Sequence, residues 1–328
     1  MWDPMRDFEK ETLSNGLDVH VSHVSGRPWQ VFEFVVHAGS DMDPVGQEGI
    51  AHFLEHVVNR HAGIPHNELE ALIERTGGHA RYGSTGFEAT RYKCFVPIHA
   101  AEEIVGRFGN MLLGEQLRHG VEIERAVIIR EFDDTYSFAM DREMRMSRQR
   151  QLFPDTALSR MACPLGTREA LTKISLGDLQ ENRDRYYVPA NISIVTAGGM
   201  FAHEVVEMLQ KTPFGIEKRG ARNPHPAPDM VEVFPADNRL NISAADHLGS
   251  LPPVDSPGYM TYARIPGVFN GDALGVCQHM LYKVLKDELR EKRQWTYDLD
   301  CVIRRFRNMR LAQVCIDTID SAAVHDIE

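Results

Sequence analysis

Cysteine is scarce in this sequence, and long apolar runs are lacking. The five cysteines are odd in number, scattered and never spaced C-x-x-C, which argues against a disulfide framework and against a thiolate zinc site. No stretch approaches the roughly 18 apolar residues that a membrane span needs. The first residues do not run from a basic segment into an apolar one, so we expect no secretory signal and a cytoplasmic, reduced protein.

Basic residues are also in deficit. The 36 lysines and arginines stand against 47 aspartates and glutamates, which gives a formal net charge of −11. A surface of this sign repels nucleic acid and anionic membranes, so we expect neither as a partner. The charge favours neutral or basic partners, although an acidic composition often serves solubility alone.

Strand patterns and helix patterns are mixed along the 328 residues. Asn15-Gly16 predicts a tight turn between two strands, and residues 31–37 and 89–97 alternate as strands do. Helical patterns cover residues from 50 onward, 67–75, 101–117, about 122–151, 175–187 and about 272–292. The mixture predicts an α+β fold, with a mixed, mainly antiparallel sheet packed with helices.

The length suggests two domains, and 43% hydrophobic content is ample for their cores. Residues 218–230 have the proline-rich composition of a linker. They separate a first domain, residues 1–217, from a second, residues 231–328. The order strand, loop, helix, strand restarts in the second domain without a histidine pair, which we interpret as a weak internal repeat.

The segment His52-Phe53-Leu54-Glu55-His56 is the sharpest chemical signal. On a helix, positions i and i+4 share a face, so both imidazoles can reach one ion. Glu55 shares that face and can act as a general base without being a ligand. This inverted order is itself a metallopeptidase signature. With 15 histidines in the chain, structural histidines in a chance match are the alternative.

A catalytic zinc usually takes three protein ligands and leaves one position open. Glu124 and Glu131 are candidates for the third ligand, since they lie seven positions apart. Two helical turns bring such residues to nearly the same direction. A solvated, charged helix face is the alternative, and it is the commoner one for helices of this composition.

Residues 49–56, Gly-Ile-Ala-His-Phe-Leu-Glu-His, resemble the metal-site helix of the pitrilysin, insulin-degrading enzyme and mitochondrial processing peptidase family. In that family a glutamate ligand follows about 75 residues later, and a supporting glutamate precedes it by seven positions. Here 74 residues separate His56 from Glu131. The resemblance implies one Zn²⁺ per chain, with His52, His56 and Glu131 as ligands, Glu55 as the base that activates water, and Glu124 as a supporting carboxylate.

The resemblance covers nearly the whole chain. Other family landmarks are Ala38-Gly39-Ser40, residues 69–78, Pro164-Leu165-Gly166-Thr167 and residues 187–191. Residues 289–293 followed by Tyr297 resemble the motif of the second repeat. That motif implies that Arg290 and Tyr297, seven positions apart, contact substrate across a closed chamber.

Two departures from the family pattern stand out. Residues 78–85 lack the asparagine that holds the substrate backbone in an N-A-x-T stretch, so we expect that contact to be altered. The second domain, up to Glu328, has about half the residues of a family domain. We therefore expect a partial second copy of the same fold. Either the sequence is a piece of a longer one, or it is a shortened variant whose chamber is completed by a partner, in a homodimer or in a heterodimer with a related subunit.

Taken together, the residues and the resemblance predict a zinc-dependent endopeptidase that hydrolyses peptides or small unfolded polypeptides in an enclosed chamber. The peptide is expected to pair in extended form with a strand edge near residues 79–86. One rival is a non-catalytic structural or assembly subunit on the same fold. A second rival is a metal protein that is not a peptidase.

Overall fold

The computed structural model describes residues 8–61, 66–114, 117, 120–135, 146, 149–150, 153, 157–218, 220, 239–243, 258–265, 271–306 and 309–318. The chain divides into two compact units. The first comprises residues 1–135 and 163–226, and the second comprises residues 136–162 and 227–328. Each unit is described by itself.

The first unit is built on a six-stranded sheet with the order β1-β2-β6-β3-β5-β4. Its strands are β1 (Glu9–Thr12), β2 (Asp18–His23), β3 (Trp29–Val36), β4 (His79–Thr85), β5 (Thr90–Pro97) and β6 (Ile192–Gly198). Only the pairing of β2 with β6 is parallel among these strands. This confirms the predicted mixed, mainly antiparallel sheet. The edge strands are β1 and β4.

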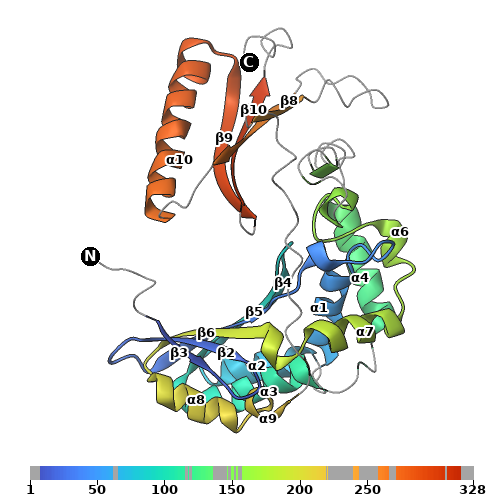
Figure 1. Cartoon of the computed structure of the whole chain (residues 1–328), viewed down its shortest axis with the longest axis vertical. Helices are drawn as coiled ribbons and strands as arrows, with labels where there is room; N and C mark the ends of the chain where they lie inside the picture. Colours follow the sequence, from blue (N-terminus) through green and yellow to red (C-terminus); the bar gives the residue numbers. More distant parts are fainter. Residues whose placement is uncertain are drawn as a thin grey trace. The chain divides into compact units, whose positions relative to one another are not determined.

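Helices α2, α3, α8 and α9 line one face of this sheet (Figure 1), while α1, α4, α6 and α7 gather near one end. The α-helices of the unit are α1 (Ile50–His61), α2 (His66–Arg75), α3 (Ala101–Leu113), α4 (Val121–Thr135), α6 (Arg168–Leu171), α7 (Leu176–Tyr186), α8 (Ala202–Gln210) and α9 (Pro213–Ile216). Short 3₁₀ helices are η1 (Ser40–Met42), η2 (Ile98–Ala100) and η4 (Pro189–Asn191). Outside this unit, η3 covers Ala157–Arg160.

The alternation of β3 explains where the core lies. Every second residue from Gln30 to Val36 is buried, and the residues between them are half-buried. On the buried side, the ring of Phe34 stacks on Phe108 of α3 at 4.9 Å and on Phe214 of α9 at 5.1 Å. A two-residue period with one face against helices is the pattern of a half-covered sheet.

The predicted elements of this unit are found with shifted ends. The turn at Asn15-Gly16 joins β1 to β2, and Gly16 has φ +88°. The helix predicted over residues 101–117 ends earlier, at Leu113, because Gly114 leaves the helical conformation with ψ 156°. The helix predicted over residues 122–151 is described to Thr135, and residues 136–145 lie outside the described residues. So do residues 221–230 of the predicted linker and the strand predicted at residues 231–234.

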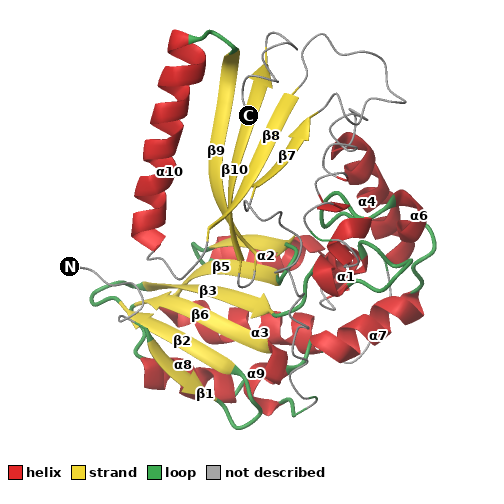
Figure 2. Cartoon of the chain, turned by 45° about the horizontal axis from the view of Figure 1, so that its top comes forward, coloured by secondary structure: helices red, strands yellow, loops and turns green. Residues whose placement is uncertain are grey.

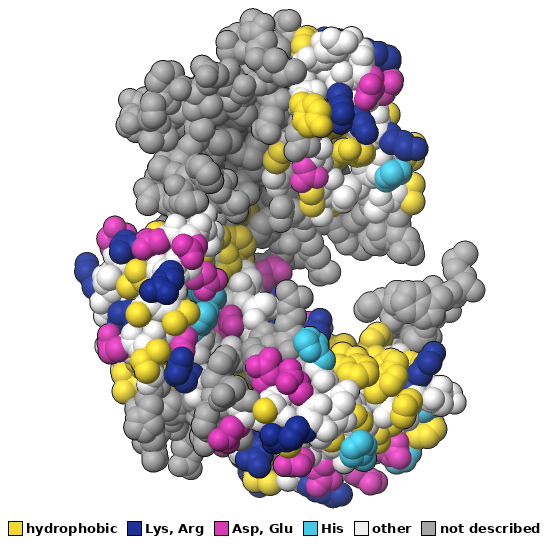
Figure 3. All heavy atoms as spheres, turned by 180° about the vertical axis from the view of Figure 1, so that it is seen from behind, with side chains coloured by type: hydrophobic (Ala, Val, Ile, Leu, Met, Phe, Trp, Pro, Cys, Tyr) yellow, Lys and Arg dark blue, Asp and Glu magenta, His cyan; other side chains and the backbone are white. Residues whose placement is uncertain are grey.

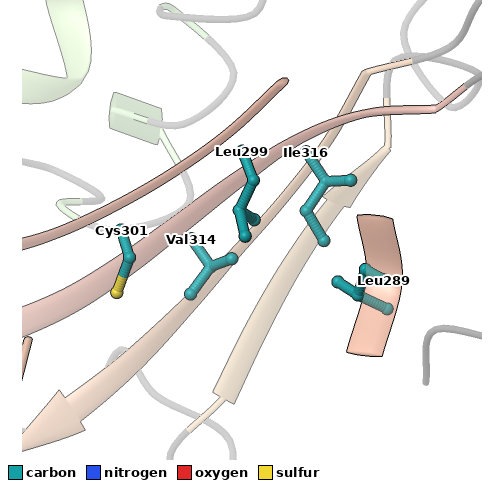
Figure 4. Close-up of a cluster of buried hydrophobic side chains, with 5 residues drawn as sticks. All are labelled: Leu289, Leu299, Cys301, Val314 and Ile316. Atoms are coloured by element: carbon teal, nitrogen blue, oxygen red, sulfur yellow. The ribbon is translucent and has the colours of Figure 1, made fainter. Parts of the chain in front are cut away.

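The second unit contains a four-stranded antiparallel sheet with the order β7-β8-β10-β9. Its strands are β7 (Arg239–Ser243), β8 (Gly258–Ile265), β9 (Thr296–Phe306) and β10 (Met309–Thr318). Helix α10 (Gly271–Leu285) continues into a π-helical segment, η6 (Lys286–Lys292). Figure 4 shows the core of the unit, in which Leu289 of η6 meets apolar side chains of β9 and β10: Leu299, Cys301, Val314 and Ile316.

The two units share the topology of three strands and the helices between them. In the first, β3 leads through helices into the hairpin β4–β5, whose second strand pairs back with β3. In the second, β8 leads through α10 into the hairpin β9–β10, whose second strand pairs back with β8. The strand orders β3-β5-β4 and β8-β10-β9 therefore correspond, whereas β6 follows its hairpin in the chain and β7 precedes β8. This is the repeat that the sequence indicated.

The described residues contain no helix of the length and hydropathy required to cross a bilayer. Acidic and basic side chains lie interspersed on the molecular face shown in Figure 3.

Candidate metal centre

Helix α1 is held at its start by a buried carboxylate. Asp43 accepts hydrogen bonds from the backbone N–H groups of Gly49, at 2.7 Å, and Ala51, at 3.2 Å. These are among the donors that a helix leaves unpaired at its first turn. Burial raises the pKa of Asp43 well above its usual range. Gly49 has φ +98°, and a Cβ there would lie 2.6 Å from the carbonyl oxygen of Leu165. The Pro-Leu-Gly landmark therefore packs against the start of α1.

The apolar face of α1 is fully enclosed. Its buried side chains are Ile50, Phe53, Leu54, Val57 and Val58. The polar side chains His52 and Glu55 are buried as well, while His56 is half-buried. Because so many of its side chains are tightly packed, helix α1 holds its polar residues in one orientation, as a preorganised site requires.

Helix α4 is fastened beside α1 by Arg125. Its guanidinium donates to the carbonyl oxygen of Ile174 at 2.7 Å and to that of Leu171. The same group lies 5.1 Å from the ring centroid of Phe53 on α1. Ile128 and Phe132 bury the inner side of α4. Arg125 thus fixes the approach of α4 to α1, a role that the sequence pattern did not reveal.

The two helices bring His52, His56 and Glu131 together. Glu131 Oε2 lies 3.5 Å from His56 Nε2 and 3.9 Å from His52 Nε2. One donor atom from each residue lies within 4.8 Å of the other two, and this is the only such group of histidine, cysteine or acidic residues in the described part of the chain.

The donor set fits Zn²⁺. Bonds of about 2.0–2.1 Å in a tetrahedron hold the donors about 3.3 Å apart, close to the shorter of these separations. Two imidazoles and one carboxylate are also a ligand set that catalytic zinc uses. The Glu131 carboxylate is 44% exposed, so the group opens toward solvent on that side.

Glu124 lies between His56 and the guanidinium of Arg60. Its Oε2 lies 3.2 Å from His56 Nδ1, and its Oε1 accepts a hydrogen bond from Arg60 Nε. Burial opposes ionisation, but the hydrogen bonds from His56 and Arg60 hold the pKa of Glu124 below its usual range. Sequence reasoning identified Glu124 and missed Arg60. The four-residue spacing of Arg60 from His56 on α1 was the available signal.

The two histidines have opposite electrostatic surroundings. Burial, reinforced by the charge of His56, lowers the pKa of His52 to about 4. Burial also acts on His56, but the carboxylates of Glu124 and Glu131 outweigh it and raise the pKa of His56 to about 9. The hydrogen bond from His56 lowers the pKa of Glu131. His56 therefore carries a proton at neutral pH when no metal competes for it.

Glu55 lies beside this group without belonging to it. Thr85 Oγ1 donates to Glu55 Oε2 at 2.8 Å, and Asn59 Nδ2 donates to Oε1 at 3.3 Å. Burial raises the pKa of Glu55 despite these hydrogen bonds. Asn59 and Thr85 were not identified from the sequence, although Asn59 lies one turn beyond Glu55 on the same helix.

The edge strand β4 passes against Glu55. The register between β4 and β5 shifts between Arg81 and Ser84, and a Cβ at the intervening Gly83 would lie 2.2 Å from Glu55 Oε1. Glycine is what allows the backbone to come so near. This is the segment in which the family asparagine is missing.

Arg290 and Tyr297 belong to the second unit, and the structure brings them together. The Arg290 guanidinium lies 4.8 Å from the ring centroid of Tyr297, within the range of a cation–π contact. Tyr297 is 76% exposed, so the pair is open to a ligand.

Known proteins resemble this chain over both units. The family model described as Insulinase (Peptidase family M16) matches residues 31–163, and the model described as Peptidase M16 inactive domain matches residues 173–327. Mitochondrial-processing peptidase subunit beta of Caenorhabditis elegans is 30% identical over 215 residues, which cover 64% of this chain and 45% of that protein. Cytochrome b-c1 complex subunit 1 of Bos taurus is 26% identical over 201 residues, covering 61% of this chain and 41% of that protein.

The chain thus spans less than half the length of these curated relatives. Among solved structures, a protease from Helicobacter pylori superposes with a TM-score of 0.74 at 18% identity, covering 98% of this chain and 77% of that one. At this identity the likeness concerns the fold.

The two family models together account for both units, and the sequence motifs resemble the same family. The chain belongs to peptidase family M16, the insulinase family.

Proposed function

We propose that this chain is a zinc-dependent endopeptidase of its family. The observation that carries the proposal is the convergence of His52, His56 and Glu131, with the buried carboxylate of Glu55 beside them and outside the ligand set. When bound, Zn²⁺ would supply Lewis-acid chemistry, acidifying water and polarising a peptide carbonyl.

The protein residues divide the remaining work. His52, His56 and Glu131 would hold the metal, and Glu124 would orient His56 through Nδ1. Glu55 would take the proton of the attacking water and deliver it to the leaving amine. A carboxyl whose pKa is raised by burial is a stronger base than an exposed one, which suits this task.

The substrate would be a peptide or a small unfolded polypeptide in extended form. β4 is an edge strand whose backbone passes Glu55, so a peptide added to that edge would lie alongside the carboxylate. Arg290 and Tyr297 would grip a substrate carbonyl from a second domain. A relative whose name describes it as a subunit supports an assembled enzyme, as a homodimer or with a related chain.

Metal content and peptide turnover test the proposal together. Glu55→Gln should retain about one zinc per chain and lose turnover, whereas His52→Ala should lose both. The matched control is Glu207→Gln on α8, remote from the site, which should change neither. Full turnover in Glu55→Gln would contradict the role of Glu55, and a parent protein that binds no zinc even in excess would contradict the metal site.

The second candidate function is that of a non-catalytic assembly subunit. The similarity to a subunit of the cytochrome b-c1 complex favours it. Retention of the histidines and of both glutamates beside them favours the peptidase. Absence of turnover in the parent protein, alone and with a related subunit, would favour the assembly function.

A further inference from the structure

The six-stranded sheet has one face that its own helices leave open. The buried alternate residues of β3 and β5 face the helices, whereas Trp29, Val31 and Phe95 on the other side are only half-buried. Figure 2 shows the described helices of the first unit on one side and at one end of this sheet. The described helices of the first unit do not cover the side chains on the opposite side.

An aromatic row crosses this open face. The rings of Trp29 on β3 and Phe95 on β5 lie 5.3 Å apart at 39°. Phe95 is directly opposite His79 of β4 in the strand register, so the two side chains project from the same face. His79 is exposed and lies on the edge strand. The aromatic row, Trp29, Phe95 and His79, thus ends at the edge that passes Glu55.

The row lies at a defined separation from Glu55. Gly83 touches the Glu55 carboxyl, and His79 precedes Gly83 by four residues on β4. Four residues of extended chain span about 13 Å. A peptide paired with β4 advances at nearly the same rate, apart from the extra residue that the register shift near Gly83 inserts in β4, so its residue about four positions from the reacting bond comes level with the aromatic row.

The charged side chains beside the aromatic row are paired with one another. The row itself would therefore recognise a ligand through contacts between rings. The neighbouring row along β3 and β5 carries Glu33 and Lys93, whose charged atoms are 3.5 Å apart. Arg91 also lies 3.8 Å from Glu33. These charges are paired with one another, whereas the aromatic rings present apolar faces and edges that suit another ring.

We propose that the aromatic row is a specificity surface that binds an aromatic side chain of the peptide, about four residues from the bond cleaved. The proposal rests on the peptidase function proposed above. An aromatic pair contributes about two- to tenfold in affinity beyond simple burial.

The test uses peptides that differ only in carrying phenylalanine or leucine four residues from the cleaved bond, on its amino or its carboxyl side, so that apolar burial is matched and only the ring differs. The parent should prefer phenylalanine in kcat/KM by about two- to tenfold on one of the two sides. Phe95→Leu keeps the apolar volume but removes the central ring of the row, and should lower this ratio toward one. Val195→Ala, on the same face but outside the row, should keep the parent ratio. Unchanged thermal unfolding of Phe95→Leu excludes a folding defect, and Phe95→Met is a second ring-free variant.

A binding measurement separates this proposal from the peptidase function. The same peptides, fluorescently labelled, are titrated with Glu55→Gln protein that carries or lacks Phe95→Leu. A preference for phenylalanine that depends on Phe95, together with a parent protein that shows no turnover, would uphold the surface and overturn the peptidase function. Turnover with no preference on either side, or with a preference that Phe95→Leu retains, would overturn the surface and leave the peptidase function intact.

Discussion

At the scale of single residues, Glu124 is the clearest case of a side chain that acts through another. It contacts His56 and Arg60 and is buried between them. We expect Glu124→Gln to weaken zinc affinity or peptide turnover by about ten- to a hundredfold, the usual cost of a lost partner to a metal ligand. Competition with a chelator measures the affinity. The control is Asp134→Asn, which changes an exposed residue of the same helix. If the two variants have the same zinc affinity and turnover, Glu124 does not support the metal site.

The protonation of His56 predicts a pH dependence of metal binding. Its pKa is raised to about 9, above the ordinary 6.5, so between these values the metal-free protein holds a proton that zinc must displace. Zinc affinity should therefore increase with pH from 6.5 to 9, by up to about tenfold per unit, and level off above 9. Chelator competition at several pH values measures this slope. In Glu124→Gln the slope should be smaller, because one cause of the raised pKa is gone.

Residue spacing predicted the two candidate histidine ligands and the base beside them. The family resemblance singled out Glu131 as the third ligand and Glu124 as its support, and neither revealed the remaining supports. His52, Glu55 and His56 share one helix, so a local pattern identifies them. Thr85 reaches Glu55 from a strand 30 positions away, and Arg125 reaches the carbonyl groups near residue 174. Such contacts depend on how elements pack, which the periodicity of one segment does not encode.

At the scale of elements, the start of α1 decides how the site is presented. Asp43→Ala would leave the N–H groups of Gly49 and Ala51 without their acceptor, and should destabilise the first unit by about 1–2 kcal/mol. Asp43→Asn should cost less, because the amide oxygen still accepts and the buried charge disappears. Thermal unfolding of the metal-free protein measures both. The interpretation fails if both variants unfold at the same temperature as the parent.

The order of elements was predicted well, and their ends and pairings less well. Alternation and helical periodicity identified β3, β5, α1 and α4, because each has a buried face. The place of β6 between β2 and β3 was not predicted, since β6 lies about 170 positions from both strands in the sequence. No local signal specifies such a pairing.

At the scale of the whole molecule, the described part of each chain contains one candidate zinc group and one pair of Arg290 and Tyr297. We expect the pair that serves one site to come from a second chain, so that the active unit is at least a dimer. Mixing Glu55→Gln chains with Arg290→Ala chains should then restore part of the activity that each lacks. Subunit exchange is checked with chains labelled by two fluorophores. Full activity in a monomer, or no recovery in exchanged mixtures, would rule out shared sites.

The insertion of β6 between β2 and β3 has a consequence for biosynthesis. All residues of the candidate metal group leave the ribosome before residue 192, where β6 begins. Until then β2 and β3 lack the strand that separates them, and both expose unpaired edges to other nascent chains. The ligands are therefore synthesised before the sheet of their unit can be completed. We expect chaperone binding to the nascent chain to be most useful in this interval, before β6 is available to complete the sheet.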